Sequence, residues 1–331
     1  MAIGTPCVLA SERAEQPEDE RRSAKPSSVL AHFGLTILRQ DPPVLRRLPI
    51  LGLAAFCVSI ASAASAPTGQ IVFSSASGVD GKTQIWMMNA SGTARHAISP
   101  STSSDEGGVL SADGRRIAFG AHGNIYVMNP NGSGVRRLTS GPASEGGPAW
   151  SPDGRWIAYD RSSSGKSAIW KMRADGSHKT RLTPPALSAV PTWSPDGLRI
   201  AYVDHGRIWV VNANGSGRHA ITHTVTGVDW APSWSRDGRR IAFESNRATG
   251  PIDQTNEIWV MNADGSHQVR LTHNSLADNH PVWSPDGSWV AFASELPHPG
   301  TSHIWVMHAN GKSLHRVSSS PAEEYYPSWS K

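Results

Sequence analysis

A segment of the type Trp-Ser-Pro-Asp-Gly recurs along this chain at a spacing near 40 residues. Clear copies occupy residues 150–154, 193–197, 234–238 (with Arg236 in place of Pro) and 283–287, a weaker copy runs over 110–114, and a truncated one occupies 329–331. The Asp-Gly pairs that begin at 113, 153, 196, 237 and 286 are 40, 43, 41 and 49 residues apart. Self-similarity at such a period indicates a propeller with one blade for each repeat. No other feature restricts the possible folds as strongly.

Each repeat contains the pattern of four short strands. The Trp segment is followed by an Asp-Gly turn and an apolar segment such as 116–119, Arg-Ile-Ala-Phe. Next come a segment such as 258–262, Ile-Trp-Val-Met-Asn, an Ala-Asp-Gly type of turn, and a short segment such as 270–272, Arg-Leu-Thr. Four strands joined by hairpin turns are typical of a propeller blade. The second-strand segment occurs six times, which predicts six blades.

The order of the segments also predicts how the ring closes. The repeats begin on a second strand at 71–73, and the chain ends on a first strand at 327–329. Because an unpaired strand edge is unfavourable, we expect these two strands to pair. The fold class is therefore predicted as all-β. It is a six-bladed β-propeller of four-stranded antiparallel blades over residues 67–331, with the ring closed by pairing of the N- and C-terminal strands.

Composition supports this fold and excludes several kinds of chemistry. The chain has 31 Gly, 24 Pro and 13 Trp and only 18% charged residues, which favours short strands and tight turns over long helices. Its net charge is only +4 and no Lys or Arg run exceeds a pair, so we expect no nucleic-acid partner. Both cysteines, Cys7 and Cys57, precede the repeats, which excludes disulfides and thiolate sites within them.

The segment before the repeats resembles an export signal. Arg46 and Arg47 are followed by an apolar run over 48–60 and by small residues over 61–66. We interpret residues 44–66 as a secretory signal peptide. A membrane anchor is the alternative, but the run is shorter than the roughly 20 residues that span a bilayer. Residues 1–43 are interpreted as a disordered or untranslated leader. The mature protein is predicted to be periplasmic or secreted, monomeric and without stable membrane insertion.

The repeated segments resemble those of the TolB-like and WD-repeat-like propellers. The likeness rests on the Pro-x-Trp-Ser-Pro-Asp-Gly, Ile-Ala-Phe and Ile-Trp-Val-Met-Asn segments and covers residues 70–331. It implies a six-bladed propeller that serves as a binding scaffold. TolB itself has an α/β domain before its propeller, for which we identify no counterpart, so membership of a Tol-Pal system stays open. Prolyl-oligopeptidase-like enzymes share this propeller, but their hydrolase domain is not found here.

One face of the propeller is predicted to hold the binding site. The Asp-Gly turns are nearly uniform, whereas the connections after the second and fourth strands vary, and variable loops on one face usually carry function. Three residues before each Pro-x-Trp position, or its equivalent, lie Asp105, Glu145, Ser188, Asp229, Asp278 and Glu324. The five carboxylates are predicted to form an acidic rim at the channel mouth, together with Trp230, His280, Tyr325 and Tyr326. The alternative is that each carboxylate accepts hydrogen bonds from backbone N–H groups of its own loop.

The predicted function is that of an exported, non-catalytic scaffold. Its partner would be a protein or peptide, for example one with a basic segment, or a cell-envelope glycan. Gly-x-Ser-x-Gly, phosphate-loop and dinucleotide motifs do not occur, and no cofactor is expected. The alternative is a metal-dependent saccharide lyase or hydrolase with its site in the channel. Related propeller lyases bind a metal through several histidines, but only His280 falls near the aligned channel positions here.

Overall fold

The computed structural model describes residues 65–100, 104–247 and 255–330. The leader and nearly all of the predicted signal peptide lie outside these ranges, so both assignments stay predictions. None of the described residues forms a helix of the length and apolar character needed to cross a membrane.

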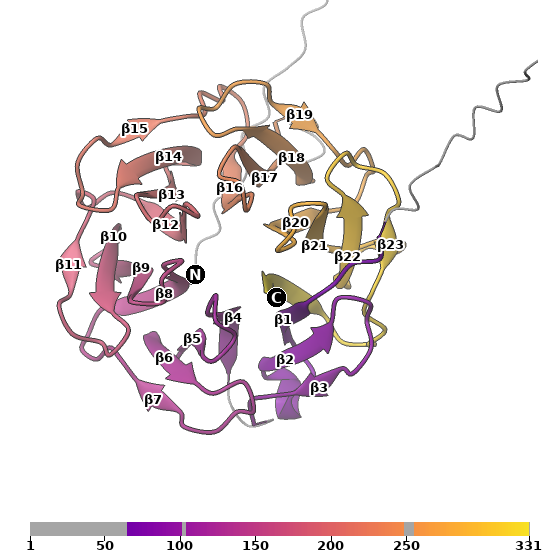
Figure 1. Cartoon of the computed structure of the whole chain (residues 1–331), viewed down its shortest axis with the longest axis horizontal. Helices are drawn as coiled ribbons and strands as arrows, with labels where there is room; N and C mark the ends of the chain where they lie inside the picture. The colour runs from indigo at the N-terminus through magenta and orange to yellow at the C-terminus, as the bar shows by residue number, and fades with distance from the viewer. Residues whose placement is uncertain (1–64, 101–103, 248–254, 331) are drawn as a thin grey trace, which may run out of the picture. The chain divides into compact units, whose positions relative to one another are not determined.

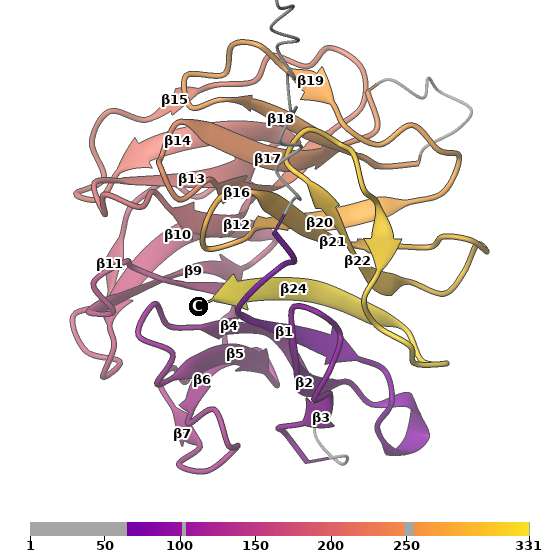
Figure 2. The ribbon, with the colours of Figure 1, turned by 45° about the vertical axis from the view of Figure 1, so that its right-hand side comes forward.

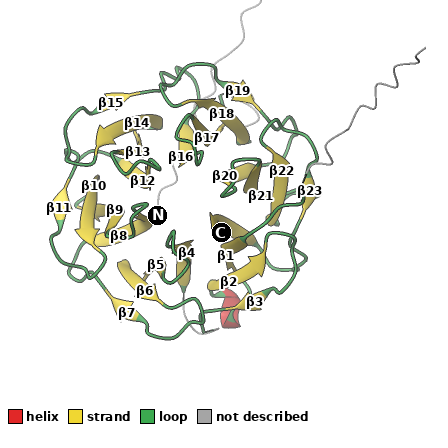
Figure 3. Cartoon of the chain, in the orientation of Figure 1, coloured by secondary structure: helices red, strands yellow, loops and turns green. Residues whose placement is uncertain are grey.

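Six antiparallel sheets of four strands stand around a central channel, as predicted (Figure 1 and Figure 3). Apart from a short 3-10 helix, η1 (Val79–Gly81), every regular element in the described ranges is a strand. From the innermost to the outermost strand, the blades are β24 (Glu324–Ser330), β1 (Gln70–Ser75), β2 (Gln84–Asn89) and β3 (His96–Ala97); β4 (Asp105–Leu110), β5 (Ile117–Ala121), β6 (Asn124–Met128) and β7 (Arg136–Arg137); β8 (Ser144–Trp150), β9 (Trp156–Ser163), β10 (Lys166–Arg173) and β11 (Thr180–Arg181); β12 (Ser188–Trp193), β13 (Arg199–Asp204), β14 (Arg207–Asn212) and β15 (His219–Ala220); β16 (Asp229–Trp234), β17 (Arg240–Ser245), β18 (Glu257–Asn262) and β19 (Val269–Arg270); and β20 (Asp278–Trp283), β21 (Trp289–Ser294), β22 (His303–His308) and β23 (His315–Arg316).

The predicted closure of the ring is confirmed. β24 pairs antiparallel with β1, and Trp329 lies opposite Ile71. Figure 2 shows β24 beside β1 at this seam. The innermost strand of this blade thus comes from the C-terminal end of the chain and the other three from the start of the repeats. The pairing leaves β1 without a free edge.

The hydrophobic core lies mainly between neighbouring blades. Most of the buried clusters combine strands of two successive blades. In one of them Ile125 and Leu138 pack with Trp150 and Tyr159 of the next blade. Arginines reinforce these boundaries, because Arg116 lies over the ring of Trp150 in the next blade, with its guanidinium carbon 4.5 Å from the ring centroid. Each blade therefore depends on its neighbours for most of its burial.

Glycines in the turns between third and fourth strands allow successive blades to approach. Gly265 has a φ of +88°, and a Cβ atom built on it would lie 2.0 Å from the carbonyl oxygen of Ile221 in the preceding blade. Gly92 stands in the same relation to Val317 of the β20–β23 blade, at 2.2 Å. Gly287, in an Asp-Gly turn, has a φ of +73° but no neighbour within 4 Å of such a Cβ atom.

We predict that Gly265→Ala destabilises the propeller more than Gly287→Ala does. Both substitutions place a Cβ atom in the left-handed region, which costs about 1 to 2 kcal/mol. Only Gly265→Ala also forces two blades apart, which adds about 1 to 3 kcal/mol. Urea-induced unfolding of the two variants and the wild type measures the difference. Equal losses would show that the blades do not touch closely at this turn.

Candidate functional site

All six innermost strands are interrupted at the same place by a β-bulge. In β12, for example, the register with β13 shifts between Ala189 and Thr192. In each blade one residue of the bulge has a positive φ: Gly107 (61°), Gly147 (53°), Val190 (51°), Ala231 (46°), His280 (55°) and Tyr326 (53°). Proline follows five of these six residues. A bulge tolerates proline because no ladder hydrogen bond from its nitrogen is needed there.

The bulge residues line a cavity in the central channel. Its volume is about 650 Å³, and all six residues with the positive φ contribute to its wall. Four of them are not glycine, and a side chain at positive φ is strained, which is common where a site needs a residue in one orientation. His122 and Gly123, from a connection between second and third strands, also border the cavity, so it opens on the variable-loop face. Pro148, Pro191, Pro232, Pro281 and Pro327 make much of the remaining wall apolar.

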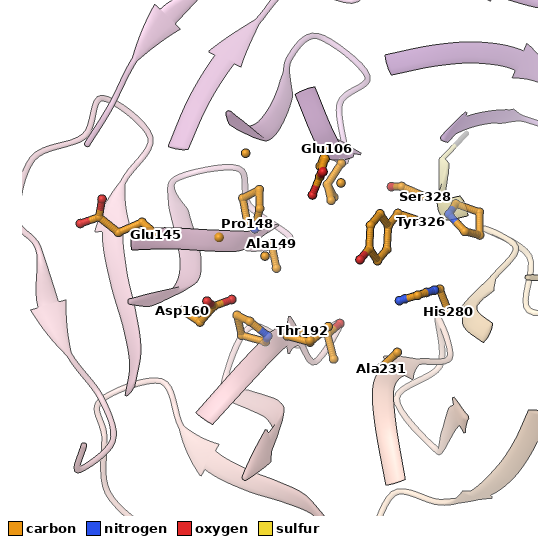
Figure 4. Close-up of a pocket in the computed structure, with 18 of the residues that line it drawn as sticks. Glu106, Glu145, Pro148, Ala149, Asp160, Thr192, Ala231, His280, Tyr326 and Ser328 are labelled. Atoms are coloured by element: carbon orange, nitrogen blue, oxygen red, sulfur yellow. The ribbon is translucent and has the colours of Figure 1, made fainter. Parts of the chain in front are cut away.

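Four polar side chains converge in this cavity. Figure 4 shows Glu106, Asp160, His280 and Tyr326 around the cavity, each from a different blade. The ring centroids of His280 and Tyr326 are 4.2 Å apart in an edge-to-face arrangement. Burial lowers the pKa of His280 to about 4, so this imidazole is neutral at pH 7. Burial, with a further contribution from the charge of Glu106, raises the pKa of Tyr326. The cavity is therefore negative at neutral pH, since its carboxylates are not balanced by the histidine.

Two carboxyl groups support the bulges from the preceding blade. Asp160 of β9 accepts a hydrogen bond from the backbone N–H of Val190, and Glu244 of β17 accepts one from the N–H of His280 at 2.5 Å. Burial raises the pKa of Asp160 to about 6 and that of Glu244 to about 7. In the β24 blade, the Ser74 hydroxyl oxygen likewise accepts a hydrogen bond from the backbone N–H of Gly107 in the next blade, at 3.0 Å. The second strands thus hold the channel wall of the next blade in place.

The sequence-based prediction did not include Asp160, Glu244 or Glu106. Asp160 and Glu244 directly follow the aromatic residue of the Ile-Ala-Tyr and Ile-Ala-Phe segments. A carboxylate at a buried position of a core strand was the available signal, because such a group needs a partner. Glu106 follows the predicted rim residue Asp105 and was also missed. Its side chain is exposed in the cavity, whereas Asp105 is 5% exposed.

The predicted rim carboxylates occupy equivalent positions but do not face the channel. Asp105, Asp229, Asp278 and Glu324 begin their inner strands, and Glu145 is the second residue of its strand. All five are 0 to 5% exposed. Only Glu145 borders the cavity, and Figure 4 shows its carboxylate directed away from it. His280 and Tyr326 do line the cavity, whereas Trp230 and Tyr325 do not. The structure thus differs from the expected open acidic rim, because these five carboxylates are buried.

Arginines inside the blades pair with three of the five buried carboxylates, Glu145, Asp229 and Glu324. Arg95 pairs with Glu324 at 3.0 Å and lies 3.9 Å from the Trp86 ring centroid. Arg161 pairs in the same way with Glu145 at 3.6 Å and lies 5.0 Å from the centroid of Trp170. A planar guanidinium can stack on an aromatic ring and donate to a carboxylate at the same time. The unit of arginine, aromatic ring and carboxylate is therefore part of the blade.

The one repeat without a rim carboxylate supports this interpretation. Ser188 lies opposite Asp204 on the neighbouring strand, whereas Asp229 lies opposite Ser245 in the next blade. The acid and the hydroxyl have exchanged places across the strand pair. Asp204 then pairs with Arg218, which stacks on Trp209 at 3.8 Å. The exchange keeps one buried carboxylate in the blade, which is what an internal structural role requires.

The described part of the chain contains no cluster of three or more His, Cys, Asp or Glu side chains that could hold a metal ion. What the cavity does offer is two carboxylates, a neutral imidazole, a phenol and an apolar wall.

Ring, bulges and cavity together define a six-bladed β-propeller with a shaped central site. A sequence profile of the family described as TolB beta propeller domain matches residues 120–205 and 185–331. The chain belongs to this family. No curated protein matched the sequence.

Solved structures share the fold at low sequence identity. TolB from Acinetobacter baumannii superposes with a TM-score of 0.70 and 19% identity, over 81% of this chain and 68% of that one. Hydrazine synthase from Kuenenia stuttgartiensis superposes with a TM-score of 0.64 and 13% identity, over 79% of this chain and 46% of that one. An oligogalacturonate lyase from Vibrio parahaemolyticus superposes with a TM-score of 0.55 and 15% identity, over 76% of this chain and 75% of that one. At these identities the likeness is one of fold.

Removing an arginine from one of these units should destabilise its blade. Arg247 pairs with Asp229, which is fully buried, and lies 5.1 Å from the centroid of Trp259. Arg247→Leu leaves the carboxylate buried without its cation, so we expect a loss of about 3 kcal/mol in the free energy of unfolding. Arg239→Leu, at an exposed position without an ion pair in the described ranges, is the control and should lose less than about 0.5 kcal/mol. Equal, small losses in both variants would show that Asp229 does not need Arg247.

The raised pKa of Glu244 predicts how stability depends on pH. Burial raises this pKa from its ordinary value of 4.5 to about 7. Between these two values the unfolded chain releases a proton that the folded chain keeps, so stability falls as the pH rises and stays lower above pH 7. Glu244→Gln should therefore be more stable than the wild type at about pH 8, by up to about 3 kcal/mol, and equal to it at about pH 4.

Thermal unfolding at the two pH values measures this difference. Glu323→Gln, which removes an exposed carboxylate, is the matched control and should show no such divergence. A Glu244→Gln variant that follows the wild type at every pH would show that Glu244 titrates normally in the folded protein.

Proposed function

We propose that this propeller is a binding scaffold that engages a polypeptide partner, or alternatively a cell-envelope glycan, on its variable-loop face. The observation that supports it is the cavity of about 650 Å³ built from the same bulge position in six blades. Binding sites are typically concave, largely apolar and provided with a few fixed polar groups. The five wall prolines and the four convergent polar side chains fit that description.

The charge of the cavity favours a partner segment with a positive group. Glu106 is exposed to the cavity, Asp160 lines it, and His280 is neutral at pH 7 because of its lowered pKa. A negative site between apolar walls attracts a lysine, an arginine or a free amino terminus, since low-dielectric walls focus the potential. The exposed Tyr326 ring lies beside these groups and could contact such a cation through its face.

Export is part of the same proposal. The sequence pattern over residues 44–66 supports a secretory signal, so the scaffold would act in the periplasm or outside the cell. N-terminal sequencing of the purified exported protein tests it. A chain that begins at residue 64 or 67 is expected, and a chain that begins at Met1 would contradict the proposal.

We predict that cavity substitutions weaken partner capture. Wild-type protein immobilised on resin should retain a specific partner from an envelope extract, and the retention should weaken as salt rises because the contact is partly electrostatic. Glu106→Gln and Tyr326→Ser should each lower the affinity for that partner by tenfold or more. Arg239→Gln, on a uniform turn of the opposite face, is the control and should bind as the wild type does. Equal binding by all variants would place the binding site outside the cavity.

A second candidate is a lyase or hydrolase that acts on a saccharide in the channel. The observation that favours it is that one cavity contains both the phenol of Tyr326 and the carboxyl group of Asp160, whose pKa is raised to about 6. Perturbed acids in a cleft are suited to general acid–base catalysis. This candidate requires turnover of an acidic oligosaccharide that Asp160→Asn abolishes. Stoichiometric metal in the purified protein that is lost in His280→Ala would support its metal-dependent form.

A further inference from the structure

A second cavity lies on the opposite face, between the β4–β7 blade and the β8–β11 blade. It is a crevice of about 540 Å³, lined by Arg116, Arg136, Gly154, Arg155, Trp156, Arg173, Ala174 and Asp175. These residues belong to Asp-Gly turns, to Ala-Asp-Gly turns or to the strand ends beside them. The crevice is therefore separate from the channel cavity, which opens on the variable-loop face.

Two of the arginines are held across the blade boundary. Arg116 donates from Nη2 to the carbonyl oxygen of Gly154 at 3.0 Å. Arg136 donates from Nη1 to the carbonyl oxygen of Asp175 at 3.0 Å. A guanidinium has five N–H groups, so both side chains keep further donors for a ligand. Their positions are set in advance by these bonds, which lowers the entropic cost of binding.

The other two arginines are exposed and weakly compensated. Arg155 lies 4.0 Å from Asp153, at the limit of an ion pair, and that carboxylate already accepts hydrogen bonds from Ser151 and from the Arg155 backbone. Arg173 forms no ion pair with any described residue. Asp175 is the one carboxylate of the lining. Four guanidinium groups therefore share a crevice with a single negative charge.

The basic charge is concentrated in this part of the propeller. Residues 104–187 contain eleven Lys or Arg residues and seven Asp or Glu residues, whereas residues 188–331 contain eleven and thirteen. A surplus of positive charge on two adjacent blades extends the attraction of the crevice for anions beyond direct contact. The modest charge of the whole chain conceals this local surplus.

We propose that the crevice is a binding site for a phosphate group, carried by a small phosphorylated molecule or by the headgroup of a lipid. Arginine forks match the oxygens of a tetrahedral oxyanion in geometry as well as in charge. Four arginines gathered at one blade boundary suit one such group better than an extended polyanion, which requires a continuous basic groove. This site is independent of the proposed scaffold function, since no residue is shared with the channel cavity.

Titration calorimetry with inorganic pyrophosphate tests the site. The wild type should bind, and the double variant Arg155→Gln/Arg173→Gln should bind at least tenfold more weakly. Both residues are exposed and make no contact across the blades, so the fold should persist. The control Arg137→Gln/Arg181→Gln removes the same charge from exposed positions of the same two blades outside the crevice, and should bind as the wild type does.

Two further probes distinguish the sources of the phosphate. Glucose 1-phosphate represents a soluble phosphate ester, and vesicles of equimolar phosphatidylglycerol and phosphatidylcholine represent a lipid headgroup. Either probe supports the site if its binding is lost in the crevice variant and kept in the control. Absence of pyrophosphate binding by the wild type, or equal loss in both double variants, would overturn the proposal, because the attraction would then be absent or merely a general effect of charge.

Discussion

The antiparallel pairing of β24 with β1 is the constraint on which the rest of the propeller depends. Most of the core of each blade lies at its boundaries with the neighbouring blades, as the packing of Ile125 and Leu138 against Trp150 shows. An open ring would disrupt the boundary cluster in which Ile71 and Trp329 pack together. Closing the ring buries this cluster and lets Trp329 donate through Nε1 to the carbonyl oxygen of Thr68 at 2.8 Å. Burial of this apolar surface is the main favourable contribution to folding.

Ring closure also creates the channel site, because it brings six equivalent bulges into one wall. Val190 and His280 hold positive φ angles, which a free strand would not adopt at equilibrium. Acceptors from the preceding blade, Asp160 and Glu244, bond the backbone N–H groups of these residues. Local strain persists where the surroundings overdetermine a conformation. The cavity thus has a fixed shape, which suits selective binding.

The charged side chains divide into those buried inside the blades and those that line the two cavities. The arginine, aromatic and carboxylate units place acids such as Glu324 inside the blades, where each needs its cation. Glu106 and Asp160 remain for the channel cavity, and Arg155 and Arg173 for the crevice on the opposite face. The two faces therefore differ in sign at their cavities, so a cationic and an anionic ligand can be recognised by separate parts of one propeller.

The repeat spacing was sufficient to predict the six blades, the four strands in each and the pairing of 71–73 with 327–329, because these depend on local pattern and period. The sequence also identified the aligned position of Asp229 and its equivalents. Of the four rim residues predicted beside the carboxylates, His280 and Tyr326 border the cavity, whereas Trp230 and Tyr325 do not. It could not determine in which direction a strand-end carboxylate points. That depends on arginines such as Arg247, 18 residues away along the chain, and on the local twist at a bulge.

Only the tertiary structure decided which residues share a site. Glu106, Asp160, His280 and Tyr326 come from four blades, and Arg116 and Arg155 from two. The repeat alignment gives His280 and Tyr326 the same position, but no spacing in the sequence marks Glu106, Asp160 or the two arginines as members of a site, since ring closure and the contact between blades bring them together. The sequence by itself therefore determined the architecture of this protein, whereas the positions of its two charged cavities follow from packing between blades, which joins residues far apart in the chain.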